Sequence, residues 1–240
     1  MAQLMRTSNP ALNARAFQGQ YAGTGEAMTL NGTVNKTGVL LLCTMATAAW
    51  AWHVFMQTRS AASVLPLLWL GLIGGFIVAL VVTFKRTWAP VGAPVYALLE
   101  GLVLGSISSV LEVRFPGISI EAVGLTFGTC ICMLLAYRSG LIRPTQKFMI
   151  GIVAATGGIM LVYLVTMVLG FFHVNVPLIY GSGPIGILFS LVVVSVAALN
   201  LILDFNMIEE GARRGAPKYM EWYGAFGLLV TLVWLDLEMV

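Results

Sequence analysis

Four carboxylates lie inside long apolar segments of this 240-residue chain. They are Glu100 in YALLEGLVLG, Asp204 in NLILDFN, and Asp236 and Glu238 in WLDLE. An ionised carboxylate is costly in hydrocarbon unless a cation, water or a hydrogen-bond donor compensates it, so intramembrane acids often mark ion or proton pathways. The competing interpretation of each is a protonated or hydrogen-bonded packing residue. We therefore treat all four as candidates for an ion pathway or a pH-dependent gate.

The composition establishes that these segments are membrane spans. Hydrophobic residues make up 59% of the chain and charged residues only 10%, against about 25% charged residues in soluble domains. The mean hydropathy of +0.92 is that of a polytopic membrane protein in contact with a lipid bilayer. The net charge of +3 arises from basic residues scattered over short loops, so nucleic-acid binding is not expected.

Seven segments contain the roughly 20 apolar residues that a spanning helix needs. They are 38–57, 63–84, 90–111, 119–137, 148–171, 184–206 and 221–240. We predict an all-α integral membrane protein with one seven-helix domain, 38–240, preceded by a polar N-terminal tail, 1–37. The tail lacks the apolar core of a signal peptide.

The basic residues predict the orientation of these spans. All but Arg59 and Arg114 of the 13 Lys and Arg fall on the side that holds the N-terminus. Because positively charged loops stay inside, the tail is predicted to be cytoplasmic and the C-terminus outside.

Helical spacing then places the acids by depth and by face. Glu100 lies near the membrane midplane, Asp204 near the cytoplasmic end of the sixth span, and Asp236 and Glu238 near the outer end of the seventh. Glu238 continues a face of small or polar residues on the seventh span and is expected to point inward, whereas Asp236 points to the other side and is the weaker candidate.

Three polar residues on or just beyond the sixth span are candidate partners of Asp204. Asn200 precedes Asp204 by one helical turn, and Arg213 and Arg214 follow the span closely enough to pair with the acid. We predict a gate in which Asp204 meets water at the interface.

Enzymatic chemistry is not expected. The two histidines, His53 and His173, lie near predicted outer loops, and no metalloprotease, nucleophile-elbow or phosphate-loop motif occurs. The three cysteines lie in apolar runs without metal-ligand spacing. An intramembrane carboxyl protease would require a second acid at the depth of Asp204. We predict no enzyme activity, no cofactor and no fixed metal site.

Five motifs carry a resemblance to a known family: NPALNARAF, MTLNGTVNKTG, YALLEGLVLGSIS, LDFNMIEEG and GAPKYMEWYGAFGLLVTLVWLDLE. In this order, over nearly the whole chain, they resemble the Bax inhibitor-1 family, and specifically its bacterial branch. The resemblance implies a seven-helix fold with the last helix surrounded by the other six. It also implies a pH-sensitive calcium leak across a membrane, here the bacterial cell (inner) membrane.

The family pattern includes a carboxylate pair formed by the sixth and seventh helices. Asp204 matches its first member. If WLDLE is aligned on the family pattern, Glu238 becomes the second member, but it is predicted near the outer face, whereas Asp204 is predicted near the inner one. An alignment without a gap places the second member at 228–232, where no acid occurs. Either the pair is absent, or the seventh helix is displaced, or the acids act separately.

We favour separate stations, with Asp204 as inner gate, Glu100 midway and Glu238 at the outer mouth. Calcium would then be held only transiently, at Glu100 and Asp204. The resemblance also supports an alternative function, a regulatory protein that binds a membrane-bound AAA+ protease through its N-terminal tail.

Overall fold

The computed structural model describes residues 26–172 and 183–240, and these residues form helices with no β-strand. The helices are α2 (Leu30–Thr58), α3 (Ala61–Phe84), the short 3-10 helix η2 (Arg86–Trp88), α4 (Ala89–Arg114), α5 (Ile118–Arg138), α6 (Gln146–Phe171), α8 (Pro184–Arg213) and α9 (Met220–Met239). Within the described ranges, seven helices are long and apolar enough to cross a membrane. The protein is an all-α, multi-pass integral membrane protein, as predicted. His173 and most of the predicted tail lie outside the described residues.

Two helices extend well past their apolar segments. α2 begins at Leu30, where the Thr29 side chain accepts a hydrogen bond from the Gly32 amide at 3.0 Å. α8 continues to Arg213 rather than ending near 206. The discrepancy arises because hydropathy measures the part of a helix that matches hydrocarbon, whereas capping and packing decide where the helix ends.

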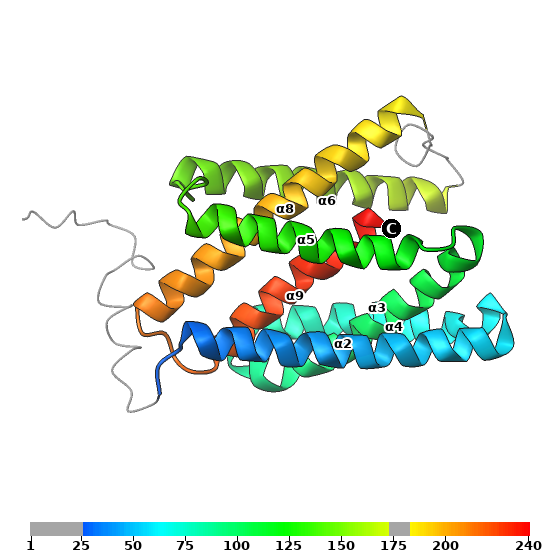
Figure 1. Ribbon diagram of the computed structural model, residues 1–240, viewed down its shortest axis with the longest axis horizontal. Coiled ribbons are helices and arrows are strands. Elements are labelled where there is room, and N and C mark those ends of the chain that lie inside the picture. The colour runs from blue at the N-terminus through cyan, green and yellow to red at the C-terminus, as the bar shows by residue number, and fades with distance from the viewer. Residues whose placement is uncertain (1–25, 173–182) are drawn as a thin grey trace, which may run out of the picture.

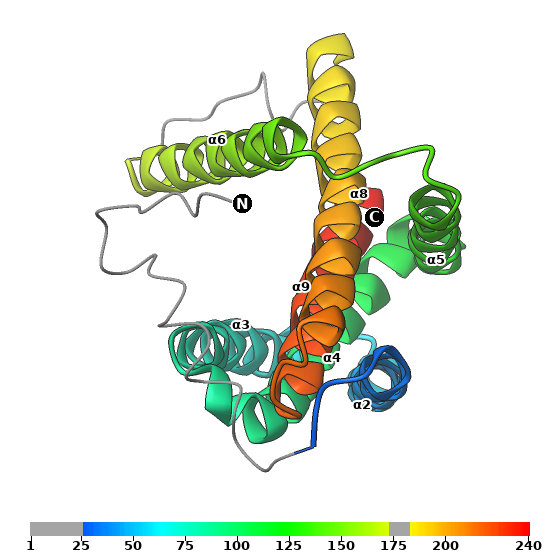
Figure 2. The same cartoon turned by 90° about the vertical axis from the view of Figure 1, so that its left-hand side faces the viewer.

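The last helix occupies the centre of the bundle (Figures 1 and 2). α9 packs against α2, α4, α5 and α8, and a larger share of its apolar window is buried than in any other span. α3 packs mainly on α4, and α6 packs on α8, so these two helices lie farther from α9. Four of the other six spans therefore pack directly on α9.

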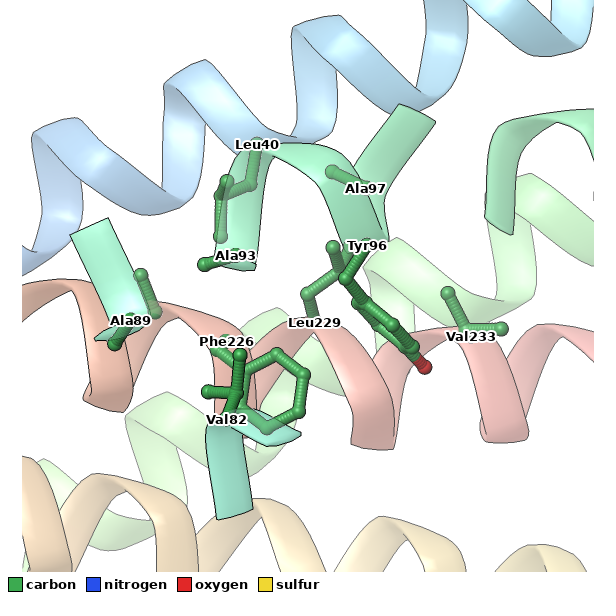
Figure 3. Close-up of a cluster of buried hydrophobic side chains, with 10 residues drawn as sticks. Leu40, Val82, Ala89, Ala93, Tyr96, Ala97, Phe226, Leu229 and Val233 are labelled. Carbon is green, nitrogen blue, oxygen red and sulfur yellow. The ribbon is translucent and has the colours of Figure 1, made fainter. Parts of the chain in front are cut away.

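Two apolar clusters hold α9 in place. In the first, Leu40 of α2 and Tyr96 of α4 pack around Phe226 and Leu229 of α9 (Figure 3). The Tyr96 and Phe226 rings meet edge to face with centroids 5.0 Å apart, a favourable aromatic geometry. The second cluster joins α8 to α9 through Ala197, Leu201, Ile202, Phe205, Leu232 and Leu235. Asp204 lies on α8 within the stretch that forms this second cluster.

Glycine allows α2 and α4 to approach closely. A Cβ atom placed on Gly105 would lie 2.7 Å from the Cα of Ala48, a distance that real Cβ atoms do not tolerate. Small residues at such contacts are typical of membrane helices, whose backbones pack by van der Waals contact. This contact fixes the α2–α4 pair beside α9.

Candidate functional site

The Asp204 carboxylate makes a hydrogen bond between two spans. The Thr231 hydroxyl of α9 donates to Asp204 Oδ2 at 2.6 Å, and the same hydroxyl lies 3.3 Å from the Gly227 carbonyl oxygen. A Cβ atom on Gly227 would stand 3.8 Å from Asp204 Oδ1, so the bare glycine leaves room beside the acid. The 2.6 Å distance lies at the short end of the range for O–H···O hydrogen bonds. Asp204 and Thr231 thus form the polar contact between α8 and the central helix.

Apolar side chains surround this polar contact. Leu201 and Phe205 flank Asp204 on α8, and Leu232 and Leu235 follow Thr231 on α9, all in one buried cluster. In such surroundings each hydrogen bond to a carboxylate matters more than it would in water. Asp204 and Thr231 therefore form a polar pair within an otherwise apolar part of the α8–α9 contact.

Asp204 lies farther from the end of its helix than the sequence predicted. α8 runs nine residues past Asp204, to Arg213, which places the acid about 13 Å from the helix end. Its partner Thr231 lies near the middle of α9, which spans Met220–Met239. The apolar run ends before the helix does, and for this reason the sequence placed Asp204 too close to the end of the helix.

The predicted partners of Asp204 contact other residues. Arg213 and Arg214 both pair with Glu210 on their own helix, and the arginine side chains are 74% and 65% exposed. Asn200 donates to Thr156 Oγ1 of α6 at 2.8 Å. The arginines cannot reach Asp204 because α8 continues as a helix and carries them two and a half turns beyond it.

Glu100 lies at a different helix contact. Its carboxylate faces α3, where a Cβ atom on Gly75 would stand 2.9 Å from Glu100 Oε1. The Tyr96 hydroxyl, one turn earlier on α4, lies within hydrogen-bonding reach of the same carboxylate. Glu100 and Asp204 therefore contact different helices, on separate sides of the bundle.

The sequence predicted that Glu238 points inward and that Asp236 points to the other side, but Asp236 is the more buried of the two acids. Asp236 is the buried one, with 7% of its surface exposed, and its Oδ1 accepts from Thr126 of α5 at 3.3 Å. Glu238 is half-buried and accepts from Tyr163 of α6 at 2.6 Å. A central helix has neighbours on several sides, so its stripe of small residues does not define the only inward face.

Each of the four predicted acids thus bonds to a different partner. In the chain as described, no three His, Cys, Asp or Glu side chains gather closely enough to hold a metal ion. Thr231 occupies the stretch of α9 at which the family pattern predicts a second acid. A hydroxyl, rather than a carboxylate, is the partner that the seventh span presents to Asp204.

Sequence analysis missed a fifth acid, Glu221, in the first turn of α9. Its side chain is fully buried, and its Oε1 accepts from the backbone amide and the hydroxyl of Thr29 at 2.8 and 2.9 Å. Lys36 of α2 pairs with Oε2, and Lys218 stands 3.6 Å from Oε1. Basic residues near both helix starts were the available signal, but only folding brings them to one acid.

Lys218 also connects the chain segment before α2 to the loop before α9. Its ammonium lies 3.2 Å from Glu26. This hydrogen bond, together with the charge of Glu221, raises the pKa of Lys218 above its ordinary value. The Glu221 group therefore fixes the start of α9 to the start of α2.

Comparison with protein families shows which family the chain belongs to. The model of the family described as Bax inhibitor 1 like matches residues 9–240, nearly the whole sequence. The chain belongs to the Bax inhibitor-1-like family. No curated protein and no solved structure matches it. This membership confirms the family predicted from the five sequence motifs, and the assignment to the bacterial branch stays a prediction.

Proposed function

We propose that this Bax inhibitor-1-like protein is a pH-sensitive cation leak channel, with calcium as the permeant ion and Asp204 as the titrating gate. The observation that carries the proposal is the hydrogen bond from Thr231 to the Asp204 carboxylate in the apolar contact between α8 and the central α9. Family membership supports it as well. Carboxylates in this kind of setting are the usual titrating groups of intramembrane ion pathways.

The gate works through the number and strength of hydrogen bonds. Ionised Asp204 accepts the Thr231 hydroxyl in a charge-assisted bond, which holds α8 against α9. Protonation removes the charge, weakens this bond and changes the relative free energies of the packed and separated arrangements of the two helices. The proton thereby acts as a ligand that binds one arrangement better than the other.

Glu100 serves as a second station for the ion. It carries a half-buried carboxylate near the middle of α4 and has no salt-bridge partner within the described chain. Calcium binds carboxylate and carbonyl oxygens and exchanges quickly where few ligands are fixed. Transient binding of calcium at Glu100 and at Asp204 suits a leak better than it suits storage. The proposal includes no enzymatic activity and no cofactor.

We place the protein in a bacterial inner membrane, with the N-terminus in the cytoplasm. The distribution of Lys and Arg supports the orientation, because all but Arg59 and Arg114 fall on the side of the N-terminal tail. The sequence motifs support the bacterial branch.

Calcium flux into proteoliposomes that enclose a fluorescent calcium indicator tests the proposal. Thr231→Val keeps the shape of the side chain and removes the hydroxyl, whereas Thr231→Ser retains the hydroxyl as a matched control. We expect the wild type and the Ser variant to share one flux–pH curve and the Val variant to show a shifted or flattened one.

Two results would overturn the proposal. Identical flux–pH curves for all three proteins would remove the Asp204–Thr231 contact from the gate. Wild-type flux no greater than that of protein-free vesicles would reject the channel itself and leave the protease-binding alternative to be tested by co-purification.

A further inference from the structure

A cavity of about 580 Å³ lies between α2, α4, α5 and α9, and neither Asp204 nor Thr231 lines it. Its volume lies within the roughly 300–1,000 Å³ that is typical of small-molecule sites. Most of its wall is apolar, supplied by residues such as Leu41, Trp52, Leu104, Phe127, Leu229 and Val233. The α2 wall runs from Leu41 to Trp52, about 16 Å along the helix. An elongated apolar cavity of this length suits an alkyl chain.

The exposed residues in the cavity wall indicate that the cavity opens between α2 and α5. These two helices stand apart on the same side of α9 (Figure 2), and they are not among the pairs of helices that pack together. Lining residues at the opening are exposed, among them Met45 at 60% on α2 and Ile120 at 80% on α5. In a membrane this opening faces lipid, so a molecule dissolved in the bilayer can enter without crossing water.

One side chain that can carry a charge lines the cavity, that of Asp236. Only 7% of the surface of Asp236 is exposed. The Thr126 hydroxyl donates a long hydrogen bond of 3.3 Å to its Oδ1. Asp236 takes part in no ion pair within the described residues. A carboxylate can accept about four hydrogen bonds, so most of its capacity is unused. The site thus combines an apolar groove with an acid that lacks a cation.

We propose that this cavity binds a single-chain amphiphile with a protonated amine, the alkyl chain lying along α2 and the ammonium pairing with Asp236. Charge complementarity selects the amine, because an ammonium supplies both the missing positive charge and several N–H donors. A zwitterionic phospholipid fits poorly, since its phosphate would bring negative charge to the acid. The site contains neither Asp204 nor Thr231, and its proposal does not depend on the channel proposal.

Native mass spectrometry of the purified protein in non-ionic detergent tests the site with dodecylamine as the probe. Dodecanol, which has the same chain and no charge, is the comparison ligand. We expect one dodecylamine to bind and dodecanol to bind at least about tenfold more weakly, a difference that corresponds to about 1.4 kcal/mol.

Variants of the protein separate the contribution of the Asp236 charge to binding from that of the cavity shape. Asp236→Asn keeps the size of the side chain and should weaken dodecylamine binding about tenfold while leaving dodecanol binding unchanged. Ala49→Phe fills the lined groove and should abolish binding of both ligands. Ala46→Phe is the matched control, because Ala46 is exposed on the same helix but does not line the cavity.

Three outcomes would overturn the proposal. The first is no bound dodecylamine on the wild type. The second is equal binding of dodecylamine by the wild type and Asp236→Asn, which would remove the carboxylate from recognition. The third is equal loss in the Ala49→Phe and Ala46→Phe variants, which would place the ligand outside the cavity. Because the readout is binding, none of these results depends on whether the protein conducts calcium.

Discussion

Replacing Lys36 by Met should destabilise the protein by leaving the buried Glu221 carboxylate without its closest cation. Glu221 is fully buried, and Lys36 is 17% exposed. Removing one partner of a buried ion pair costs about 3–5 kcal/mol. That figure is an upper bound here, because Thr29 still donates two hydrogen bonds and Lys218 remains 3.6 Å away. We therefore expect a loss of about 2 kcal/mol, since Met preserves the apolar stem of the lysine.

The assay is reversible unfolding in mixed micelles that contain increasing amounts of a denaturing detergent. Arg214→Met is the matched control, because Arg214 is 65% exposed and its pair with Glu210 is a surface contact. Such pairs contribute about 0–1 kcal/mol. Adding Glu221→Gln to Lys36→Met should recover part of the lost stability, since the unpaired charge is then gone. A Lys36→Met variant no less stable than the Arg214→Met control would refute the reasoning.

Three further results are expected. Gly105→Ala should cost about 1–3 kcal/mol of stability, because its Cβ would meet the backbone of α2. Gly151→Ala, which meets nothing within 4 Å, should be neutral or stabilising in the same unfolding assay, and equal effects would contradict the close α2–α4 contact. Glu100→Gln keeps the side-chain shape and removes the charge, so calcium flux should fall while the midpoint of thermal unfolding stays level or rises; unchanged flux would exclude Glu100 from the ion path. Cysteine-labelling reagents that cannot cross membranes should modify single cysteines introduced at 59–60 from outside the cell and those at 139–141 only after lysis, and the reverse pattern would contradict the orientation.

The sequence predicted the helices well because membrane spans have a strong signal in composition. Lipid requires long apolar segments whose backbone groups bond within the helix, so all seven spans could be found from hydropathy. The first and last residues of the helices were harder to predict from the sequence. Thr29 caps α2 ahead of its apolar run, and α8 carries a polar extension to Arg213.

The acids of the candidate site could be identified from the sequence, but their partners could not. Spacing along one helix predicts which residues share a face, and it says little about which neighbour that face meets. Thr231 could be assigned to the correct helix, but its hydrogen bond to Asp204 depends on the relative position of α8 and α9 along their axes, which the sequence does not show. Glu221 was overlooked because its cation, Lys36, lies on α2, at the far end of the sequence.

Calcium flux measured from about pH 6 to 8 for the wild type and Asp204→Asn tests the central claim most directly. The Asn variant keeps the size of the side chain and cannot ionise, so it should carry calcium at a rate that hardly changes with pH. If Asp204 is the titrating gate, wild-type flux should approach the rate of the variant as the pH falls and protonates the acid. A wild-type pH dependence that persists in Asp204→Asn would contradict the account.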